Sequence, residues 1–308
     1  MKLTIVICTH NRSALLSKTL KSINNAIIPA QANITILVLA NACTDDTTST
    51  LQEYQQRQLD QHWLPIEFAE EPKVGKSYAL NKALTYIPDG WIAFIDDDHR
   101  VDENYFKSVA DAIINYPNTS LFCGKIIPDW TGEEPAWAHE KGKYKITPFP
   151  VPNFDLGDNI LSSHEKTFIP GGGNLIVEQK VFERIGNFSE ALGPKGHNLM
   201  GSEDSDFILR ALKAGENIKY IPAIVQYHYV DLSHLKLAYL IVKSFQRNRS
   251  MTLAHHPEPI RIPNYLWRKL GRYSAGILFS FNIIRIRFHL TKAAGIVGQI
   301  VGHIQSRH

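Results

Sequence analysis

The sequence predicts an α/β protein built on a parallel sheet with helices on its faces. Apolar, β-branched runs at residues 3–8 and 34–39 are each followed by a polar loop and a segment of helical periodicity. A third apolar run, residues 91–95, ends in three consecutive aspartates. Strands that alternate with helices indicate successive βα units, and such units form parallel sheets.

The elements follow in a regular order. The expected strands are residues 3–8, 34–39, 66–69 and 91–95, and the expected helices begin near residues 14, 47 and 75. Residues 126–170 contain six prolines and little periodicity, so we expect extended strands and loops there. Trp130 and Trp137 in this segment can stack on the sugar rings of an acceptor, although a plain surface excursion explains the segment equally well.

Composition sets limits on the class of protein. A chain of 308 residues with 44% hydrophobic and 20% charged residues can bury one large core or two modest ones, which excludes gross disorder. Its cysteines, Cys8, Cys43 and Cys123, are too few and too scattered for a disulfide framework or a zinc site. The first apolar run is shorter than that of a signal peptide, so we expect a cytoplasmic protein.

Two acidic clusters indicate the chemistry. Asp96, Asp97 and Asp98 follow an apolar run, and adjacent carboxylates are costly unless a cation or a proton neutralises them, which predicts a metal site. Glu203 and Asp204 can supply a general base. Simpler explanations are turn chemistry for the first cluster and helix first-turn charge for the second. The loops at residues 9–12, 41–46 and 96–98 would converge, because ligands bind at the carboxyl ends of parallel strands.

With these motifs in order, residues 2–230 resemble a family 2 glycosyltransferase of the GT-A fold. The resemblance implies a Rossmann-like mixed sheet flanked by helices, to which a helical C-terminal tail is added. Six segments match the family's motifs in sequence order: residues 5–12, 41–47, 73–81 and 96–98, Gly172-Gly173-Asn174, and residues 201–204.

The resemblance also implies roles for individual residues. Asp98 would bind a Mn²⁺ or Mg²⁺ ion on the donor diphosphate, and His228 would complete the coordination, although a histidine packed at a strand end is an equal alternative. Asp204 would be the catalytic base, with Glu203 orienting it or binding the acceptor. The residues expected to contact the nucleotide-sugar donor are Thr9, Asn11, Arg12, Asn41, Asp45, Lys76, Asn81, Asp96, Asp97, Gly172 and Gly173.

One position departs from the family pattern. Many members have an aspartate before the asparagine of the second loop, where it accepts a hydrogen bond from uracil, but here that residue is Ala40. Uridine donors are therefore in doubt, and the nucleotide base is left open.

The C-terminal region, residues 231–308, differs in charge from the catalytic region, residues 1–230. The net charge of +3 divides into +8 for residues 259–308, which contain no Asp or Glu, and −5 for the rest. The uncharged run at residues 273–284 is shorter than the roughly twenty residues that span a bilayer. A helix over residues 277–301 would carry a basic stripe opposite an apolar one, as an interfacial helix on anionic lipid does.

The function expected from these observations is metal-dependent, inverting sugar transfer to a glycan or lipid-linked acceptor at the inner face of the cell membrane, in cell-surface polysaccharide synthesis. The tail could instead dock on the catalytic domain or a partner subunit, and no motif suggests that it binds nucleic acid. Two alternatives stay open: nucleotidyl transfer on a similar sheet, and a catalytically weakened scaffold or interaction protein at the membrane.

Overall fold

The computed structural model describes residues 1–166, 168–190, 203–255 and 261–305. The chain divides into two compact units. The first consists of Met1–Pro128 and Pro152–Tyr229, and the second of Asp129–Val151 and Val230–His308. The tryptophan-containing segment therefore belongs in part to the second unit.

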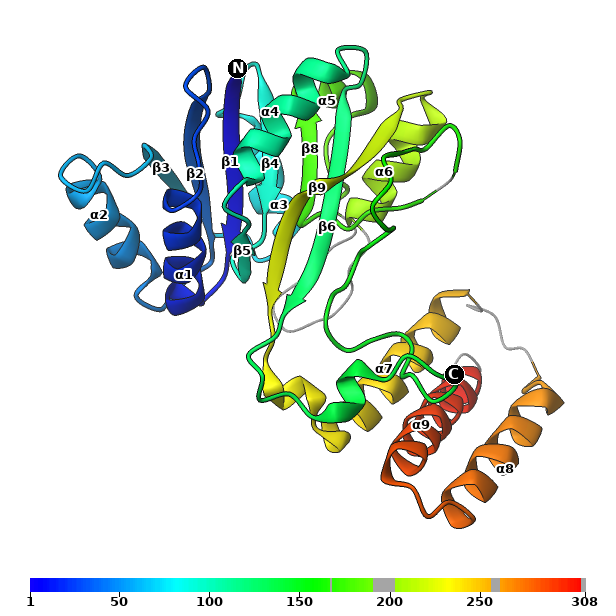
Figure 1. Ribbon diagram of the computed structural model, residues 1–308. Helices are drawn as coiled ribbons and strands as arrows, with labels where there is room; N and C mark the ends of the chain where they lie inside the picture. Colours follow the sequence, from blue (N-terminus) through cyan, green and yellow to red (C-terminus); the bar gives the residue numbers. More distant parts are fainter. Residues whose placement is uncertain (167, 191–202, 256–260, 306–308) are drawn as a thin grey trace. The chain divides into compact units, whose positions relative to one another are not determined.

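A mixed sheet forms the centre of the first unit (Figure 1). Within the described residues its strand order is β3-β2-β1-β4-β8-β6-β9-β5, with β7 beside β9. The neighbours among β3, β2, β1 and β4 are parallel, whereas the pairs β4–β8, β8–β6 and β9–β5 are antiparallel. The strands are β1 (Lys2–Thr9), β2 (Asn33–Asn41), β3 (Ile66–Glu71), β4 (Trp91–Ile95), β5 (His99–Val101), β6 (Leu121–Asp129), β7 (Leu161–Ser162), β8 (Asn174–Glu178) and β9 (Ile218–Tyr229).

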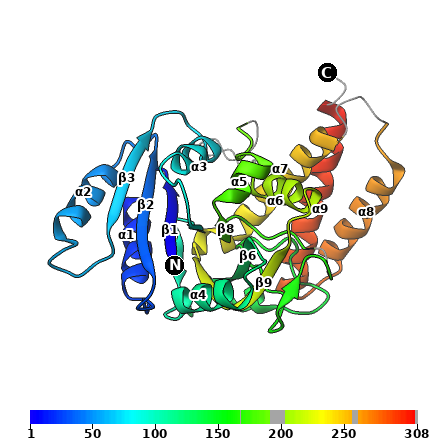
Figure 2. The same ribbon diagram turned by 90° about the horizontal axis from the view of Figure 1, so that it is seen from above.

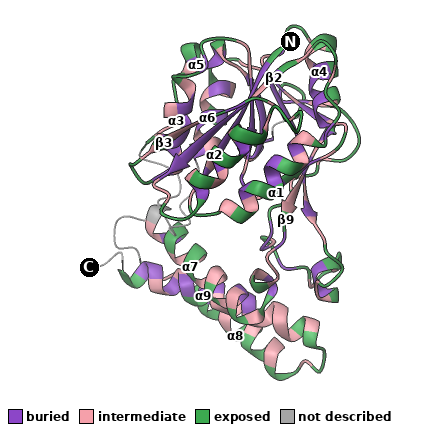
Figure 3. Cartoon of the chain, turned by 90° about the vertical axis from the view of Figure 1, so that its left-hand side faces the viewer, coloured by how far each residue is buried: buried purple, intermediate pink, exposed green. Residues whose placement is uncertain are grey.

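Helices cover both faces of this sheet (Figure 2). Alternate residues of β1 point to opposite faces, so Ile5 and Ile7 pack in one core cluster and Val6 in the other. The cluster of Ile5 includes α1 (Ser13–Asn24), α2 (Thr47–Arg57) and α4 (Tyr105–Asn115). The cluster of Val6 includes α3 (Lys76–Leu84), α5 (Lys180–Ile185) and α6 (Glu203–Lys213). Figure 3 shows the strands as the most continuously buried elements of this unit. The result is a helix–sheet–helix arrangement of three layers with a core on each face of the sheet, which fixes the strand ends that carry the polar loops.

Gly124 in β6 is required by the close approach of the neighbouring strand. A Cβ at this position would lie 1.9 Å from the carbonyl oxygen of Ile224 in β9. We expect Gly124→Ala to destabilise the protein by about 1–3 kcal/mol, the usual cost of overpacking, measured as a lower urea midpoint. Gly271→Ala is the control, because nothing lies within 4 Å of its added Cβ and alanine favours the helix. Equal stability of Gly124→Ala and wild type would contradict this assignment.

The second unit is mainly helical. Its helices are the 3-10 turns η1 (Ala136–His139) and η2 (Leu232–Leu235), followed by α7 (Leu237–His255), α8 (Asn264–Leu278) and α9 (Ile283–Gln305). Gly298 allows α9 to approach α7 closely, since its Cβ would lie 2.2 Å from the carbonyl oxygen of Phe245. No helix within residues 1–166, 168–190, 203–255 and 261–305 is both long and apolar enough to cross a membrane.

The prediction of one amphipathic helix over residues 277–301 is wrong. The chain leaves α8 after Leu278, and the side chain of Asn282 accepts a hydrogen bond from the amide of Ile284 at 2.9 Å, which caps the start of α9. Ile284 packs in the core cluster of the second unit, and the ring of Phe288 lies 5.6 Å from that of Tyr144. Ile284 and Phe288, two residues of the predicted apolar stripe, therefore pack against other residues of the second unit.

Candidate active site

The first acidic cluster forms a tight turn between β4 and β5. The amide of His99 donates a hydrogen bond to the carbonyl oxygen of Asp96 at 3.0 Å. The hydroxyl of Thr19, on α1, lies 2.9 Å from the carbonyl oxygen of Asp97 and 2.7 Å from that of His99. Helix α1 therefore holds the backbone of the turn, which fixes the directions of the carboxylates.

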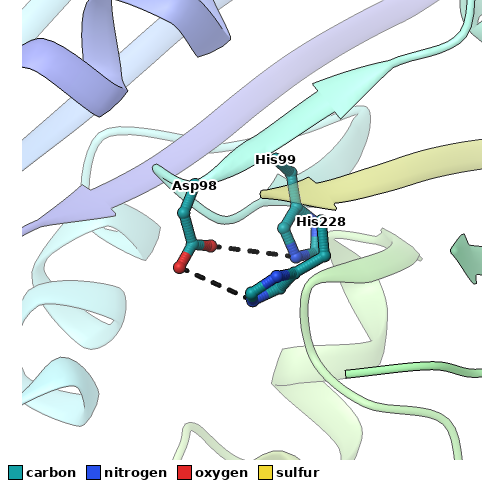
Figure 4. Close-up of side chains that lie close together, drawn as sticks. All are labelled: Asp98, His99 and His228. Carbon is teal, nitrogen blue, oxygen red and sulfur yellow. Dashed lines mark ion pairs between the residues drawn. The ribbon is translucent and has the colours of Figure 1, made fainter. Parts of the chain in front are cut away.

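Asp98, His99 and His228 point toward one another (Figure 4). One ligand atom from each lies within 4.8 Å of the other two. The carboxylate oxygens of Asp98 lie 3.9 Å from Nε2 of His99 and 3.6 Å from Nε2 of His228. These separations are longer than hydrogen bonds and suit three ligands that share one ion. The pairing of β5 with β9, which sets His99 opposite His228, brings them together.

A buried amide fixes the tautomer of His99. The Oε1 atom of Gln226 lies 2.6 Å from Nδ1 of His99, while its Nε2 donates to Tyr105 at 3.0 Å and to Asn174 at 3.1 Å. Because the amide nitrogen of Gln226 faces these acceptors, its oxygen faces His99, and Nδ1 must carry the proton. The Nε2 lone pair of His99 is then directed at Asp98, as in a metal-binding histidine with an outer-shell partner.

His228 has the same arrangement. Its Nδ1 atom lies 2.5 Å from the carbonyl oxygen of Tyr229 and donates to it, which leaves Nε2 facing Asp98. Burial lowers the pKa of His228 and outweighs the opposing effect of Asp98. The neutral imidazole, which is the form that binds metal ions, is therefore favoured.

Two cations compensate part of the negative charge. The Nζ atom of Lys76 lies 2.5 Å from Asp96, and Nη1 of Arg12 lies 3.1 Å from Asp97 and 3.0 Å from Asp98. Burial would raise the pKa of Asp96, but Lys76, together with His99 and His228, outweighs burial and holds that pKa below its usual range. Burial, followed by the charge of Asp98, raises the pKa of Asp97 to about 6 against the opposing effect of Arg12. The turn thus keeps excess negative charge, which favours binding of a cation.

A small pocket connects the two acidic clusters. Asp204, at the start of α6, accepts hydrogen bonds from the amide of Gly172 at 2.7 Å and from that of Ser205 at 2.7 Å. Gly201 and Ser202, which begin the predicted motif at residues 201–204, lie outside the described residues. Burial raises the pKa of Cys8 to about 12, so this thiol is protonated. The pocket is lined by the side chains of Cys8, Lys76, Asp96, Glu203 and Asp204 and by Gly172, among other residues.

Asn41 and Asn81, both predicted donor contacts, have protein partners. The Asn41 side chain donates to the carbonyl oxygens of Glu71 at 3.1 Å and Lys73 at 2.7 Å, and accepts from the amide of Gly75 at 2.8 Å. Asn81 makes two hydrogen bonds, of 2.9 and 3.0 Å, with the backbone of Phe188. Both side chains tie loops together, and their contact with a donor stays a prediction.

The loop after β1 is joined to the loop after β2. The side-chain oxygen of Asn11 accepts a hydrogen bond from the amide of Thr44 at 2.6 Å, and Asp45 accepts one from the amide of Ser13 at 3.1 Å. Thr9 is buried at the end of β1. The structure therefore brings Arg12, Lys76, Asp96, Asp97, Gly172 and Gly173 to the acidic turn and its pocket, whereas Asn11 and Asp45 position the loops.

A family model described as glycosyl transferase family 2 matches residues 4–186, more than half of the chain. The chain belongs to glycosyl transferase family 2. The curated glycosyltransferase GlyA of Streptococcus pneumoniae serotype 4 is 26% identical over 115 residues, 37% of this chain; the match spans only 15% of GlyA's length.

Solved structures share the fold of this glycosyltransferase. The mannosyltransferase PcManGT of Pyrobaculum calidifontis, in complex with GDP-Man and Mn²⁺, has a TM-score of 0.54 at 16% identity, over 99% of this chain and 72% of that chain. TarS 1-349 of S. aureus, in complex with UDP-GlcNAc, has a TM-score of 0.55 at 14% identity, over 100% and 93%. These likenesses confirm the GT-A type of α/β fold that the sequence predicts.

Sequence reasoning missed two residues of the site in this family 2 glycosyltransferase. His99 directly follows the aspartates, and Gln226 lies two residues before His228 on the same face of β9. A histidine beside an acidic run is a local signal for metal binding that was available. No local signal indicated the role of Gln226, because its contacts with His99 and Tyr105 join residues more than a hundred positions apart in the sequence.

Gly173 is expected to be needed for activity. A Cβ there would lie 2.5 Å from a carboxylate oxygen of Asp96 and 2.7 Å from Cε1 of His99. Gly173→Ala must therefore displace site groups, and we expect kcat/KM to fall about 10²-fold while the unfolding midpoint changes little. Gly171→Ala is the matched control, since its Cβ would make only an ordinary contact of 3.9 Å with Asp204. Wild-type activity in Gly173→Ala would show that this close approach is not needed.

Proposed function

We propose that this glycosyltransferase transfers a sugar, with inversion, from a nucleotide-sugar donor to a hydroxyl group of a glycan or lipid-linked acceptor. Asp98, His99 and His228 would hold the divalent ion, and Asp204 would be the base. The proposed setting is cell-surface polysaccharide synthesis at the inner face of the cell membrane. The arrangement of one carboxylate and two imidazoles carries this proposal, because it joins acidic-turn and strand-end residues into one ligand set.

The donor atoms of this set suit a divalent ion. Oxygen ligands suit Mg²⁺ and Mn²⁺, whereas imidazole nitrogens are less suited to Mg²⁺, so the two histidines favour Mn²⁺ over Mg²⁺. When bound, the ion supplies positive charge that stabilises the departing nucleoside diphosphate. The presence of GDP-Man and Mn²⁺ with PcManGT, and of UDP-GlcNAc with TarS, supports a nucleotide sugar as donor.

The surroundings of Asp204 support the proposed role as base. The amide of Gly172 fixes one carboxylate oxygen, and the pocket that Asp204 lines also contains Asp96 and Lys76. A carboxylate held beside the donor site can accept the proton of an acceptor hydroxyl as that oxygen attacks the sugar. Glu203 is 4% exposed and lines the same pocket, which favours a positioning role for it over direct contact with solvent. Asp96 and Lys76 would bind the ribose and diphosphate.

A nucleotide panel tests the proposal. UDP, GDP, CMP and dTDP are added to the wild type with and without Mn²⁺, and the unfolding midpoint is measured. We expect one nucleotide to raise the midpoint only with Mn²⁺, because bound ligand stabilises the native state. No shift with any nucleotide would overturn the proposal and favour a scaffold. The panel also identifies the nucleotide base of the donor. Sequence leaves that base open, because Ala40 is 1% exposed and offers no side-chain acceptor for uracil.

The second unit supports membrane association. Residues 261–305 are basic and contain no Asp or Glu, so they would be attracted to the anionic inner leaflet. The same basic charge is our reason for proposing a lipid-linked acceptor. Sedimentation with anionic vesicles tests this part separately from donor binding, and absence of binding at low salt would overturn it.

A further inference from the structure

A cavity of about 210 Å³ lies within the second unit. Its walls come from α7, α8 and α9 and from the segment at residues 146–150. Lys243 donates to the carbonyl oxygen of Pro150 at 3.2 Å, and Lys292 donates to that of Thr147 at 2.8 Å. The two lysines therefore fix this segment against α7 and α9 and shape the cavity.

The cavity is basic. Four cationic side chains line it: Lys243, Arg247, Lys269 and Lys292. No carboxylate of the described residues lines it, and Arg247 and Lys269 are exposed and have no ion pair in the described part of the chain. Cationic groups that converge without acidic partners are the usual recognition chemistry for phosphate.

The turn between α8 and α9, residues 278–283, exposes a group of large apolar side chains. The exposed fractions are 77% for Leu278, 80% for Phe279, 103% for Phe281 and 64% for Ile283. Figure 3 shows α8 as mostly exposed or intermediate, and Leu266 is its buried residue. Contiguous exposed apolar side chains mark a binding surface, and the carboxylate-free, basic helices beside this turn fit an anionic lipid surface.

The cavity and the apolar turn lie at suitable spacing along the same two helices. Tyr273, which lines the cavity, is five residues before Leu278, and Thr291 is eight residues after Ile283. At 1.5 Å per residue these intervals are about 7.5 and 12 Å. With α8 and α9 standing along the membrane normal and the turn inserted by about 5–10 Å, the depth typical of interfacial apolar groups, the cavity would lie at the level of the lipid phosphates.

We propose that this cavity binds the phosphate group of a membrane lipid while residues 278–283 insert among the acyl chains. The shared chemistry is a phosphate or diphosphate on an apolar chain, which an anionic headgroup and a lipid-linked acceptor both present. This inference rests on the membrane association proposed above, but not on sugar transfer.

Vesicle sedimentation with charge-matched variants tests the cavity. The vesicles are phosphatidylcholine with and without phosphatidic acid. We expect wild type to bind the phosphatidic acid vesicles, and Arg247→Gln with Lys269→Gln to bind about tenfold more weakly than the control pair Arg261→Gln with Arg268→Gln. The control removes two exposed charges from residues that do not line the cavity. Equal loss in both pairs would overturn the cavity as the site, whereas no binding by wild type would overturn membrane association itself.

Two further measurements separate the sources of phosphate and test the turn. In EDTA, which removes metal-dependent donor binding, inorganic diphosphate should raise the unfolding midpoint of wild type but not of the cavity pair. Stabilisation by diphosphate without vesicle binding would overturn the lipid source. Phe281→Ser should weaken vesicle binding and leave the diphosphate shift intact, whereas Leu59→Ser, at a position 83% exposed in the first unit, should change neither. Unchanged vesicle binding by Phe281→Ser would overturn insertion.

Discussion

Replacing Asp204 with Asn lowers the turnover of sugar transfer by about 10²- to 10⁴-fold, the usual contribution of a general base. Asparagine keeps an oxygen that can accept the hydrogen bond from the amide of Gly172, so the geometry of the pocket should survive. What is lost is the basicity of the carboxylate. The measurement is the rate at which nucleoside diphosphate is released with the nucleotide sugar identified by the panel.

The control for this prediction is Asp206→Asn. Asp206 lies on the same helix and pairs with Arg210 at 2.9 Å, four residues away, so its loss should have a small effect on stability and none on turnover. Metal-dependent nucleotide affinity should stay at the wild-type value in Asp204→Asn, because this residue acts on the acceptor. Full turnover in Asp204→Asn would remove the base assignment and favour nucleotidyl transfer.

Replacing Asp98 with Ala weakens binding of the divalent ion by more than about 100-fold, since even outer-shell partners of metal ligands contribute 10- to 100-fold. Asp98 is the carboxylate of the set and faces Nε2 of both histidines. Its loss leaves two imidazoles, which bind Mn²⁺ and Mg²⁺ poorly without a charged oxygen. Calorimetric titration with Mn²⁺ in the presence of the nucleotide measures the effect.

Asp111→Asn is the matched control for Asp98→Ala. Asp111 is an exposed residue of α4 that pairs with Lys107 at 2.7 Å, and its loss should leave Mn²⁺ affinity unchanged. Gln226→Leu should give an intermediate loss, because it removes the hydrogen bond that orients His99 without removing a ligand. Mn²⁺ affinity at the wild-type value in Asp98→Ala would show that the ion binds elsewhere.

The local sequence pattern was sufficient to predict most of the strands and helices in the parallel part of the first unit. The predicted strand at residues 91–95 has the same bounds as β4, and the run at residues 3–8 lies inside β1, because buried parallel strands are short apolar segments between polar loops. Local pattern failed at the C-terminal helices. Apolar spacing continues from Ile277 to Phe288 across the turn, and the capping residue Asn282 was the signal of the break.

The sequence by itself determined the family, the α/β class, the acidic turn and the basic C-terminal region, because each is carried by neighbouring residues or by motifs in order. Only the tertiary structure decided which side chains meet. The pairing of β5 with β9 sets His99 against His228, and the register of those strands places Gln226 beside His99 in the candidate metal site. The folding of α7, α8 and α9 around residues 146–150 likewise gathers four cations that are scattered in the sequence. The physical reason is that strand register and helix packing depend on the burial of apolar surface across the whole chain, which no local pattern encodes.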